Sequence, residues 1–283
     1  MSLAPETRSN KPARSREDVS SVTEEAQVLG SQVPRTHVRV VLPAFNEAES
    51  LHGLIPRVAQ TFLDSGCSCD LIVVDDGSTD GTCESANELA IDFPFVNLVK
   101  HSENRGLGAA ITTCLREGIV GLKDDDIVIA MDADNTHPPQ LMTRMIPMIR
   151  EGHDIVIASR YQRGARAVGL ARHRELLSIG ARLAMQLLFP IRGVRDYTCG
   201  YRAYRVGVLR KALEQQHGVL VHEQGFACMA ELLILLSRQD IVIGEVPLLL
   251  RYDYKRGASK MRVLETIGRT FRMAFRHRFQ RSS

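Results

Sequence analysis

Two aspartates that stand two positions apart are the clearest candidates for catalytic chemistry in this sequence. Asp132 and Asp134 directly follow residues 127–131, a short run of Ile, Val, Ala and Met. Two carboxylates at the end of a buried strand can share one divalent cation. A hard cation such as Mg²⁺ or Mn²⁺ suits a nucleotide diphosphate because it neutralises charge on the leaving group. The alternative is a polar turn in which the aspartates cap backbone N–H groups, and the triplet alone fits both interpretations.

A second acidic pair, Asp75 and Asp76, follows another predicted strand at residues 70–74, which is apolar from Leu71 onward. A carboxylate here could accept hydrogen bonds from the edge of a nucleobase. It could equally cap the helix that is expected to start with Asp80 or Thr82 as its N-cap. The pair therefore adds a candidate nucleotide contact without deciding between the two roles.

Basic residues at two places are candidate phosphate contacts. Arg160 stands two residues after the predicted strand at 154–158, and Lys255, Arg256 and Lys260 cluster further along the chain. Arginine can grip a phosphate through two parallel hydrogen bonds, whereas lysine offers a point charge. On charge alone, a solvated basic loop is the favoured alternative.

Several enzyme classes find no support in the motifs. The G-x-G at Gly106 and Gly108 lacks the third glycine of a dinucleotide fingerprint and follows the third apolar run, so it predicts a helix start packed on a sheet. No H-x-x-x-H pair argues for zinc, and no G-x-S-x-G elbow argues for acyl-transfer chemistry. His137, close behind the acidic triplet, is a candidate third contact to metal or phosphate.

The elements that must position these residues alternate along the chain. Strands are predicted at residues 38–43, 70–74, 96–100, 127–131 and 154–158, and helices at 47–65, from 80 or 82 onward, 106–118 and 138–151. This alternation predicts an α/β fold with a mainly parallel, Rossmann-like sheet flanked by helices. Ligands bind beyond the carboxyl ends of such strands, and three strands end there in polar sequence.

The second half of the chain has a less regular pattern. The sequence predicts a basic loop at residues 164–174, helices at 176–189 and 226–237, and strands at 200–206 and 241–246. Residues 1–36, rich in Ser, Pro, Arg and Glu, are expected to be a disordered tail. A single catalytic domain is expected at 37–261, followed by a basic amphipathic helix at 262–283.

Composition and charge narrow the class of protein. The 283 residues are 44% apolar and 24% charged, which is ordinary for a globular protein. Residues 251–283 hold ten Lys or Arg against two Asp or Glu, so the basic charge is concentrated at one end. This is not the pattern of a general nucleic-acid binder, and no nucleic-acid partner is expected.

The sequence also favours a location in the cytoplasm. No apolar run reaches the roughly 18 residues that a membrane span needs, and no signal-peptide pattern is present. The six cysteines show no metal-ligand spacing and are expected to be reduced thiols. We therefore expect a cytoplasmic protein, with peripheral contact to the cytoplasmic membrane face as an option, and the sequence leaves oligomerisation open.

The motifs, taken in order, closely resemble glycosyltransferase family 2. The resemblance rests on PAFNE at 43–47, VDDGSTDGT at 74–82, NRGLGAA at 104–110, and MDAD at 131–134 followed by HPP at 137–139. Further on, SRY at 159–161, DYTCGYR at 196–202 and GASK at 257–260 look like the dolichol-phosphate mannose synthase branch. The resemblance covers about residues 37–265, nearly everything outside the tails.

The resemblance implies a GT-A fold and an inverting sugar transfer from a nucleoside diphosphate sugar. By position, Asp132 and Asp134 would hold the metal and diphosphate, and the catalytic set would be these two with Asp196. The implied substrate-binding residues are Pro43, Phe45, Glu47, Asp76, Ala133, Arg160, Arg202, Lys255, Arg256 and Lys260. Pro43, Phe45, Glu47 and Asp76 would hold the base and ribose.

Two positions depart from the pattern of the synthases. Thr136 stands where they usually carry a metal-binding Gln, and Tyr254 stands where they usually carry Arg. Lys255 and Arg256 follow and could substitute for that Arg. Metal affinity and acceptor identity are therefore open at this stage.

The acceptor decides whether a general base is needed. A polyprenyl or dolichyl phosphate is already anionic, whereas an alcohol or amine on a soluble or carrier-bound small molecule needs help. Asp196, His222 and Glu223 are the candidates, with Asp196 first. Its alternative role is to anchor the turn at Gly200. Candidate donors are GDP-mannose, UDP-glucose and UDP-N-acetylglucosamine, and a weakly active sugar-nucleotide-binding subunit is the less favoured class.

The C-terminal helix allows two interpretations. Ile267, Phe271, Phe275 and Phe279 share one face, surrounded by arginines. Such a helix could pack on the catalytic domain. It could also lie on an anionic membrane surface, close to a lipid-phosphate acceptor.

Overall fold

The computed structural model describes residues 36–168, 172–225 and 227–251. The predicted tail (apart from Thr36), the predicted helix at 262–283, Tyr254 and the three predicted basic contacts Lys255, Arg256 and Lys260 lie outside the described residues. Everything below concerns the unit that begins at Thr36.

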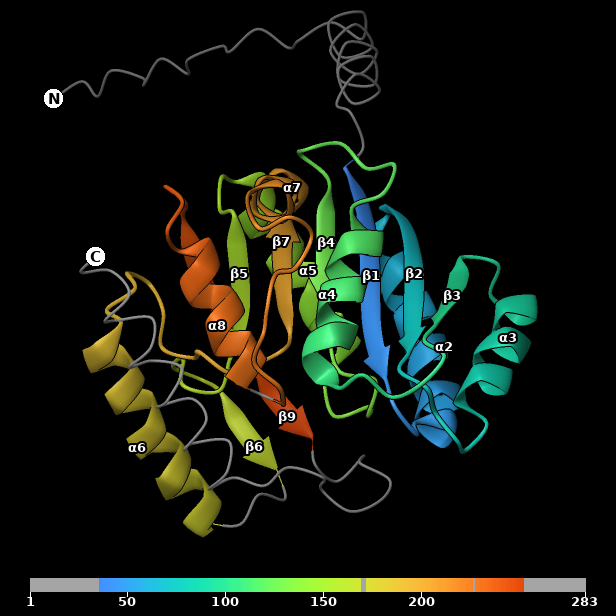
Figure 1. Ribbon diagram of the computed structural model, residues 1–283, viewed down its shortest axis with the longest axis horizontal. Helices are drawn as coiled ribbons and strands as arrows, with labels where there is room; N and C mark the ends of the chain where they lie inside the picture. Colours follow the sequence, from blue (N-terminus) through green and yellow to red (C-terminus); the bar gives the residue numbers. More distant parts are fainter. Residues whose placement is uncertain (1–35, 169–171, 226, 252–283) are drawn as a thin grey trace, which may run out of the picture. The chain divides into compact units, whose positions relative to one another are not determined.

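A seven-stranded sheet with the order β3-β2-β1-β4-β7-β5-β8 forms the centre of this unit (Figure 1). Only β7 runs antiparallel, against both of its neighbours, so the prediction of a mainly parallel sheet is confirmed. The strands are β1 (His37–Ala44), β2 (Ser68–Asp75), β3 (Val96–Lys100), β4 (Ile127–Ala130), β5 (Ile155–Ser159), β7 (Arg202–Arg205) and β8 (Ile243–Pro247).

Helices cover both faces of the sheet, with α4, α7 and α8 on one face and α2 and α5 on the other (Figure 1). Their bounds are α2 (Ala48–Ser65), α3 (Thr82–Asp92), α4 (Leu107–Gly118), α5 (Met142–Arg150), α6 (Arg172–Leu188), α7 (Val206–Gln215) and α8 (Ala227–Leu236). A short 3-10 turn, η1 (Pro139–Leu141), precedes α5. In α2 the buried residues Leu51, Leu54, Ile55 and Val58 recur at helical spacing, which explains why this stretch lies on the sheet as a helix.

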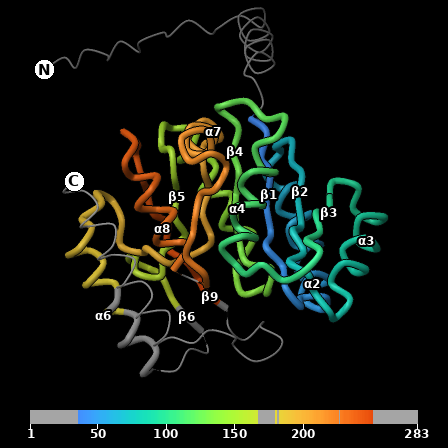
Figure 2. Tube along the Cα trace, viewed as in Figure 1, coloured from blue at the N-terminus to red at the C-terminus, as the bar shows by residue number. Residues whose placement is uncertain are grey.

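The chain between β5 and α6 differs from its prediction. The expected basic loop at 164–174 contains a strand, β6 (Arg166–Val168), and the first residues of α6. Strand β6 pairs in parallel with β9 (Leu249–Arg251), as Figure 2 shows beyond the lower ends of the central strands. The pairing was not visible in the sequence because both strands have three residues and lie far apart in the chain. Helix α7 was also missed.

The direction of β7 has a consequence for the site. Because β7 runs opposite to β4 and β5, its first residue, Arg202, lies level with Ala130 and Ile157 near the ends of those strands. The residues that precede β7 therefore meet the residues that follow β4 and β5 at one edge of the sheet.

Among the described residues, no helix is both long and apolar enough to cross a bilayer.

Candidate active site

The loops that follow β1 and β2 are locked together by hydrogen bonds. The backbone N–H of Asn46 donates to Ser78 Oγ at 2.9 Å, and Asn46 Oδ1 accepts from the N–H of Thr79 at 2.9 Å. The N–H of Glu47 donates to Thr82 Oγ1 at 2.9 Å. Asn46 adopts a left-handed φ of 55°, which asparagine tolerates better than most residues, so its side chain can bridge the two loops.

Three predicted nucleotide contacts lie on the first of these loops or just before it. Phe45 is 36% exposed although it is a large aromatic residue, and it directly follows β1. Pro43 is half-buried at the end of β1. Glu47 Oε2 accepts from Ser50 Oγ at 2.8 Å, so its carboxylate is oriented by the first turn of α2.

Asp76 is tied to a third loop, which precedes α4. Its Oδ1 accepts from the N–H of Arg105 at 3.0 Å, its Oδ2 accepts from the N–H of Gly106 at 2.8 Å, and His101 Nδ1 lies 2.7 Å from Oδ1. The side chain is buried, with 2% exposure. Asp76 therefore does not cap the helix that follows it in sequence. It joins the loop after β2 to the loop before α4.

Gly77 permits the close approach of these two loops. Its φ is +68°, and a Cβ added here would lie 2.4 Å from the carbonyl carbon of Glu103. Any L side chain would meet both a disfavoured backbone conformation and a backbone atom that cannot move out of the way. The Gly106–Gly108 helix start packs through Gly108, whose added Cβ would meet the carbonyl oxygen of Glu223 at 2.4 Å.

The two aspartates of the acidic triplet follow β4 at the centre of the same edge. The N–H of Asp132 donates to His137 Nδ1 at 3.2 Å, so the ring proton of a neutral His137 sits on Nε2, which lies 3.8 Å from Asp132 Oδ2. The His137 ring is buried and stacks on Tyr201 at 5.1 Å between centroids. His137 is thus placed to orient Asp132, and Ala133 is buried beneath the turn.

Asp134 is held by the residue that departs from the synthase pattern. Thr136 donates to Asp134 Oδ1 through its hydroxyl at 2.6 Å and through its N–H at 3.2 Å. Asn135, between them, has a left-handed φ of 62° and accepts a 2.6 Å hydrogen bond from Arg57 Nη1 in α2. The Thr136 hydroxyl therefore positions a carboxylate in this structure.

Arg160, at the end of β5, is bound to Asp196 by a two-pronged ion pair. Arg160 Nε and Nη2 lie 2.8 and 2.7 Å from the two Asp196 oxygens, and Nη2 also donates to Thr198 Oγ1 at 2.6 Å. Asp196 is fully buried and also accepts from the N–H groups of Thr198 and Cys199.

Burial by itself would raise the pKa of Asp196, but the charge and hydrogen bonds of Arg160 outweigh it and hold that pKa below its ordinary value. Burial likewise would lower the pKa of Arg160, and Asp196 raises it well above its ordinary value. A carboxylate so fully engaged and so reluctant to take a proton is a poor general base. Of the two roles expected for Asp196, the hydrogen bonds favour the anchor.

The turn that Asp196 anchors lies against Asp132. Gly200 ends the turn, and a Cβ added there would lie 2.9 Å from Asp132 Oδ1. In β8, Glu245 accepts the N–H of Asp196 at 2.8 Å, and burial raises the pKa of its carboxyl. The ends of β4, β5 and β8 and the start of β7 thus hold the acidic pair and Arg160 together.

Arg202 does not fit its predicted role as a substrate contact. Its side chain has no exposed surface, and its guanidinium donates to the carbonyls of Met229 at 2.9 Å and Tyr197 at 2.7 Å. Arg202 is the first residue of β7, and its neighbours Ala203 and Tyr204, which point to opposite faces of the sheet, are fully buried as well. Arg202 therefore supports the core between β7 and α8.

The other two candidate bases lie on the loop before α8. Glu231 Oε2 accepts the N–H groups of His222 and Glu223, both at 2.8 Å, and so fixes this loop beside the start of α4. The His222 side chain is mostly exposed, at 68%.

Sequence reasoning missed several residues that shape the site. His101 binds Asp76, and Glu245 holds the Asp196 turn. Tyr161 and Arg182 also meet at the end of β5. The available signal was weak, because each acts through a partner distant in sequence.

The acidic pair suits a hard cation that a substrate helps to bind. Within the described residues, no cluster of three or more His, Cys, Asp or Glu side chains forms a ready-made metal site. Two carboxylates from one turn supply oxygen ligands of the kind that Mg²⁺ and Mn²⁺ prefer, and diphosphate oxygens and water can complete the shell. The residues present therefore fit a nucleotide-bound divalent cation.

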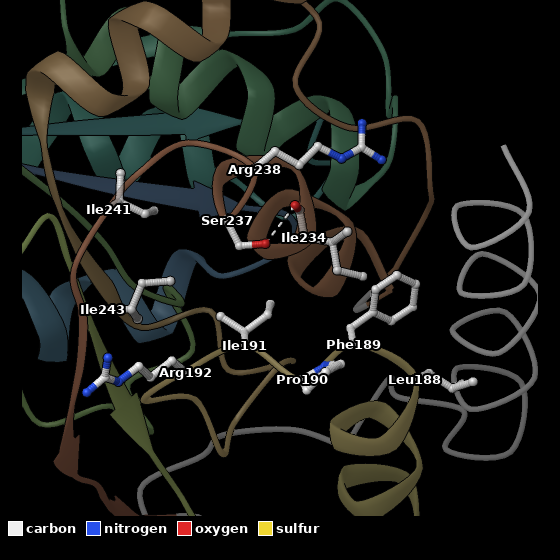
Figure 3. A pocket seen from close by; sticks show the side chains of 10 residues that line it. All are labelled: Leu188, Phe189, Pro190, Ile191, Arg192, Ile234, Ser237, Arg238, Ile241 and Ile243. Carbon is white, nitrogen blue, oxygen red and sulfur yellow. Dashed lines mark hydrogen bonds between the residues drawn. The ribbon is translucent and has the colours of Figure 1, made fainter. Parts of the chain in front are cut away.

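A separate hollow of about 350 Å³ lies where α6, α8 and β8 meet (Figure 3). It is lined by Leu188, Phe189, Pro190, Ile191, Arg192, Ile234, Ser237, Arg238, Ile241 and Ile243. None of these is a predicted site residue, so the hollow is not part of the candidate active site.

Comparison with known proteins decides the family. The model of "Glycosyl transferase family 2" matches residues 39–213. The chain belongs to glycosyl transferase family 2. The match begins within β1 and ends within α7. It leaves out the predicted contacts Lys255, Arg256 and Lys260 and the candidate bases His222 and Glu223.

Two relatives of this glycosyltransferase carry the names of lipid-phosphate mannosyltransferases. The chain is 32% identical to a dolichol-phosphate mannosyltransferase of Pyrococcus furiosus over 80% of this chain and 59% of that protein. It is 30% identical to an undecaprenyl-phosphate mannosyltransferase of Micrococcus luteus over 79% and 87%. The chain therefore spans about three fifths of the first relative's length and most of the second's.

The fold is that of GT-A glycosyltransferases. A solved glucosyl-3-phosphoglycerate synthase from Mycobacterium tuberculosis, bound to Mn²⁺ and UDP-glucose, superposes with a TM-score of 0.58 over 95% of this chain and 84% of that one. At 23% identity the likeness concerns the fold alone.

Proposed function

We propose that this glycosyltransferase moves a hexose, mannose first among the candidates, from a nucleoside diphosphate sugar to a polyprenyl phosphate. The observation that carries the proposal is the convergence of Asp132 and Asp134 with the Arg160–Asp196 pair at one edge of the sheet. The relatives named as lipid-phosphate mannosyltransferases support the acceptor and the sugar. GDP-mannose is the first donor to test, with UDP-glucose and UDP-N-acetylglucosamine as alternatives.

On the nucleotide side, the loops after β1 and β2 would hold the base and ribose. The partly exposed Phe45 ring offers an apolar surface to the base, and Glu47 and Pro43 lie next to it. The Asp76 carboxylate already interacts with His101, Arg105 and Gly106. Its remaining lone pairs would accept hydrogen bonds from the base or ribose. These loops are already fixed before substrate arrives, which lowers the entropic cost of binding.

Asp132 and Asp134 would hold a divalent cation on the diphosphate. When bound, Mg²⁺ or Mn²⁺ stabilises negative charge on the departing diphosphate. Thr136 would keep the Asp134 carboxylate in place. His137 accepts the backbone N–H of Asp132 and would hold the turn on which Asp132 stands. Thr136 would thus contribute to metal affinity through Asp134 and not as a ligand.

The transfer would invert the anomeric carbon in one displacement. An oxygen of the acceptor phosphate attacks that carbon, and the bond to the diphosphate breaks with its electron pair leaving on the diphosphate. The acceptor phosphate is already ionised at neutral pH, so no side chain has to remove a proton. Arg160, kept charged and oriented by Asp196, would position the phosphate. Lys255, Arg256 and Lys260 stay predicted contacts of the same kind.

The direct test is a transfer assay with the purified full chain. GDP-mannose, UDP-glucose and UDP-N-acetylglucosamine are each incubated with undecaprenyl phosphate and Mn²⁺ or Mg²⁺, and lipid-linked sugar is detected by mass spectrometry. We expect lipid-linked hexose with one donor and none when the cation is chelated. Sugar release to water or to a soluble acceptor alone would overturn the lipid acceptor. Tight donor binding without any transfer would indicate a binding subunit.

Peripheral membrane contact is a separate part of the proposal. The arginines between 262 and 283 would each contribute about 1 kcal/mol near an anionic surface, screened by salt. We expect the full chain to float with anionic vesicles at low salt, and a chain lacking residues 268–283 to float less. Equal behaviour of both chains, or no binding at low salt, would contradict this and favour a soluble acceptor.

A further inference from the structure

Two arginines gather on one aromatic ring beside the candidate active site. Tyr161 directly follows Arg160, and the Arg160 Cζ lies 5.5 Å from the centre of the Tyr161 ring. Arg182, from the middle of α6, places its Cζ 4.9 Å from the same ring centre. A tyrosine face attracts a guanidinium, so the ring fixes the position of both side chains.

The two arginines differ in how their charge is compensated. Arg160 is paired with the buried carboxylate of Asp196 at 2.7 Å. Within the described residues, Arg182 forms no ion pair and donates no hydrogen bond, and its Nε is buried without an acceptor. A buried N–H donor without an acceptor is unusual, because it has lost its hydrogen bond to water without forming another. The missing acceptor is therefore expected to come from a ligand.

Arg160 also keeps part of its guanidinium available. Its Nε and Nη2 bind Asp196 and Thr198, whereas its Nη1 donates to none of the described residues. The side chain is 24% exposed. Two guanidinium groups on one ring, each with spare N–H donors and only one carboxylate between them, form an anion-binding arrangement. Their planar donors match phosphate oxygens.

We propose that Arg182 binds the phosphate group of the acceptor, together with Arg160, and that Tyr161 holds it there. The inference rests on the proposed function and adds a residue that the motifs did not indicate. The ligand chemistry is a phosphate monoester. A polyprenyl phosphate and a small phosphorylated metabolite share that chemistry, so the test must separate them.

Steady-state kinetics give the first measurement. We expect Arg182→Gln to raise the KM for undecaprenyl phosphate about 10- to 100-fold, as loss of a charge-assisted hydrogen bond predicts, with the donor KM unchanged. Arg182→Lys keeps the charge without the fork and should fall between the two. Tyr161→Leu should raise the same KM, and Tyr161→Phe should not. Arg192→Gln, an exposed arginine at the separate hollow, is the matched control and should behave as wild type.

Direct binding gives a measurement that does not depend on turnover. Calorimetry compares farnesyl phosphate, farnesol and 3-phosphoglycerate on the wild-type chain and on Arg182→Gln. We expect wild type to bind farnesyl phosphate and Arg182→Gln to lose about tenfold or more of that affinity, with any farnesol binding equal in both. A larger loss for 3-phosphoglycerate would assign the same phosphate site to a soluble acceptor.

Two results would overturn the assignment of Arg182. One is that Arg182→Gln, folded as judged by its melting curve, keeps both the acceptor KM and the affinity for both phosphates. The other is that wild type binds neither phosphate. If wild type binds farnesyl phosphate through Arg182 but transfers no sugar to undecaprenyl phosphate, the proposed function fails and the phosphate site stands.

Discussion

The proposed nucleotide side and the proposed acceptor side of this site are built in different ways. On the nucleotide side, three loops after β1, β2 and β3 are tied by short hydrogen bonds through Asn46, Asp76 and Thr82, and most of these involve backbone N–H groups. On the acceptor side, the Arg160–Asp196 ion pair and the Tyr161 ring bring together residues from three separate segments.

The difference fits what each half would recognise under the proposed function. A nucleotide has a fixed shape, so loops held in one conformation by their backbone can bind it at small entropic cost. An acceptor phosphate is mainly a charge, and a few guanidinium groups oriented by a buried carboxylate are enough to place it. Substituting a carboxylate between the halves should abolish sugar transfer. Substitutions on the acceptor side should lower stability and turnover. Substitutions on the nucleotide side should mostly weaken donor binding.

The largest effect is expected from the acidic pair that both halves share. Asp134→Asn, and secondarily Asp132→Asn, should reduce transfer by about 1,000-fold or more while the fold stays intact, because a neutral amide is a weak ligand for a hard cation. Mn²⁺-dependent binding of the nucleoside diphosphate should weaken in parallel.

The matched control is Asp125→Asn, which changes an aspartate whose side chain is 91% exposed and pairs with Arg205. It should leave transfer unchanged. Full turnover by purified Asp134→Asn would refute a metal role for this residue and would leave the two halves without a common centre.

The second effect concerns the ion pair that anchors the acceptor side. Asp196→Asn leaves the Arg160 guanidinium beside a buried neutral amide, and breaking a buried pair in this way typically lowers the free energy of unfolding by about 3–5 kcal/mol. Urea denaturation at pH 7 measures the loss. Transfer should fall as well, because Arg160 is no longer held in place.

Acid pH gives a specific signature of this pair. The pKa of Asp196 is lower in the folded protein than its ordinary value of 3.8, so its contribution to stability is fully present above about pH 4 and is lost as pH falls through the folded pKa. The gap between wild type and Asp196→Asn should therefore narrow below pH 4. A variant that keeps wild-type stability but loses turnover would instead favour Asp196 as a proton acceptor.

The same contrast explains how much of the molecule the sequence revealed. The strands of the sheet and the polar ends of β1, β2 and β4 were predictable because each depends on a local run of Val and Ile followed by a turn. The sequence left two roles open for Asp196 and placed Arg202 at the substrate, because it did not show that β7 inserts antiparallel between two strands that come earlier in the chain. Such a pairing decides which side chains turn inward, and no local pattern encodes it.

The loop tie at Asp76 is expected to give the smallest of these effects. Asp76→Ala removes a carboxylate that accepts from the N–H groups of Arg105 and Gly106 and lies 2.7 Å from His101 Nδ1. We expect the donor KM to rise about tenfold with kcat changed less than threefold, because the nucleobase end is remote from the bond that breaks.

His101 separates direct contact from loop positioning. His101→Gln can still donate towards Asp76 but cannot reproduce the second contact, in which His101 Nε2 lies 3.0 Å from Thr113 Oγ1. If Asp76 touches the base itself, His101→Gln should keep most of the donor affinity measured by calorimetry, while Asp76→Ala loses it. If Asp76 only ties the loops, both variants should lose similar affinity and stability together. Unaltered donor affinity in Asp76→Ala would mean that the nucleotide side does not depend on this tie, and the contrast between the two halves would then rest on the loops after β1 and β2 alone.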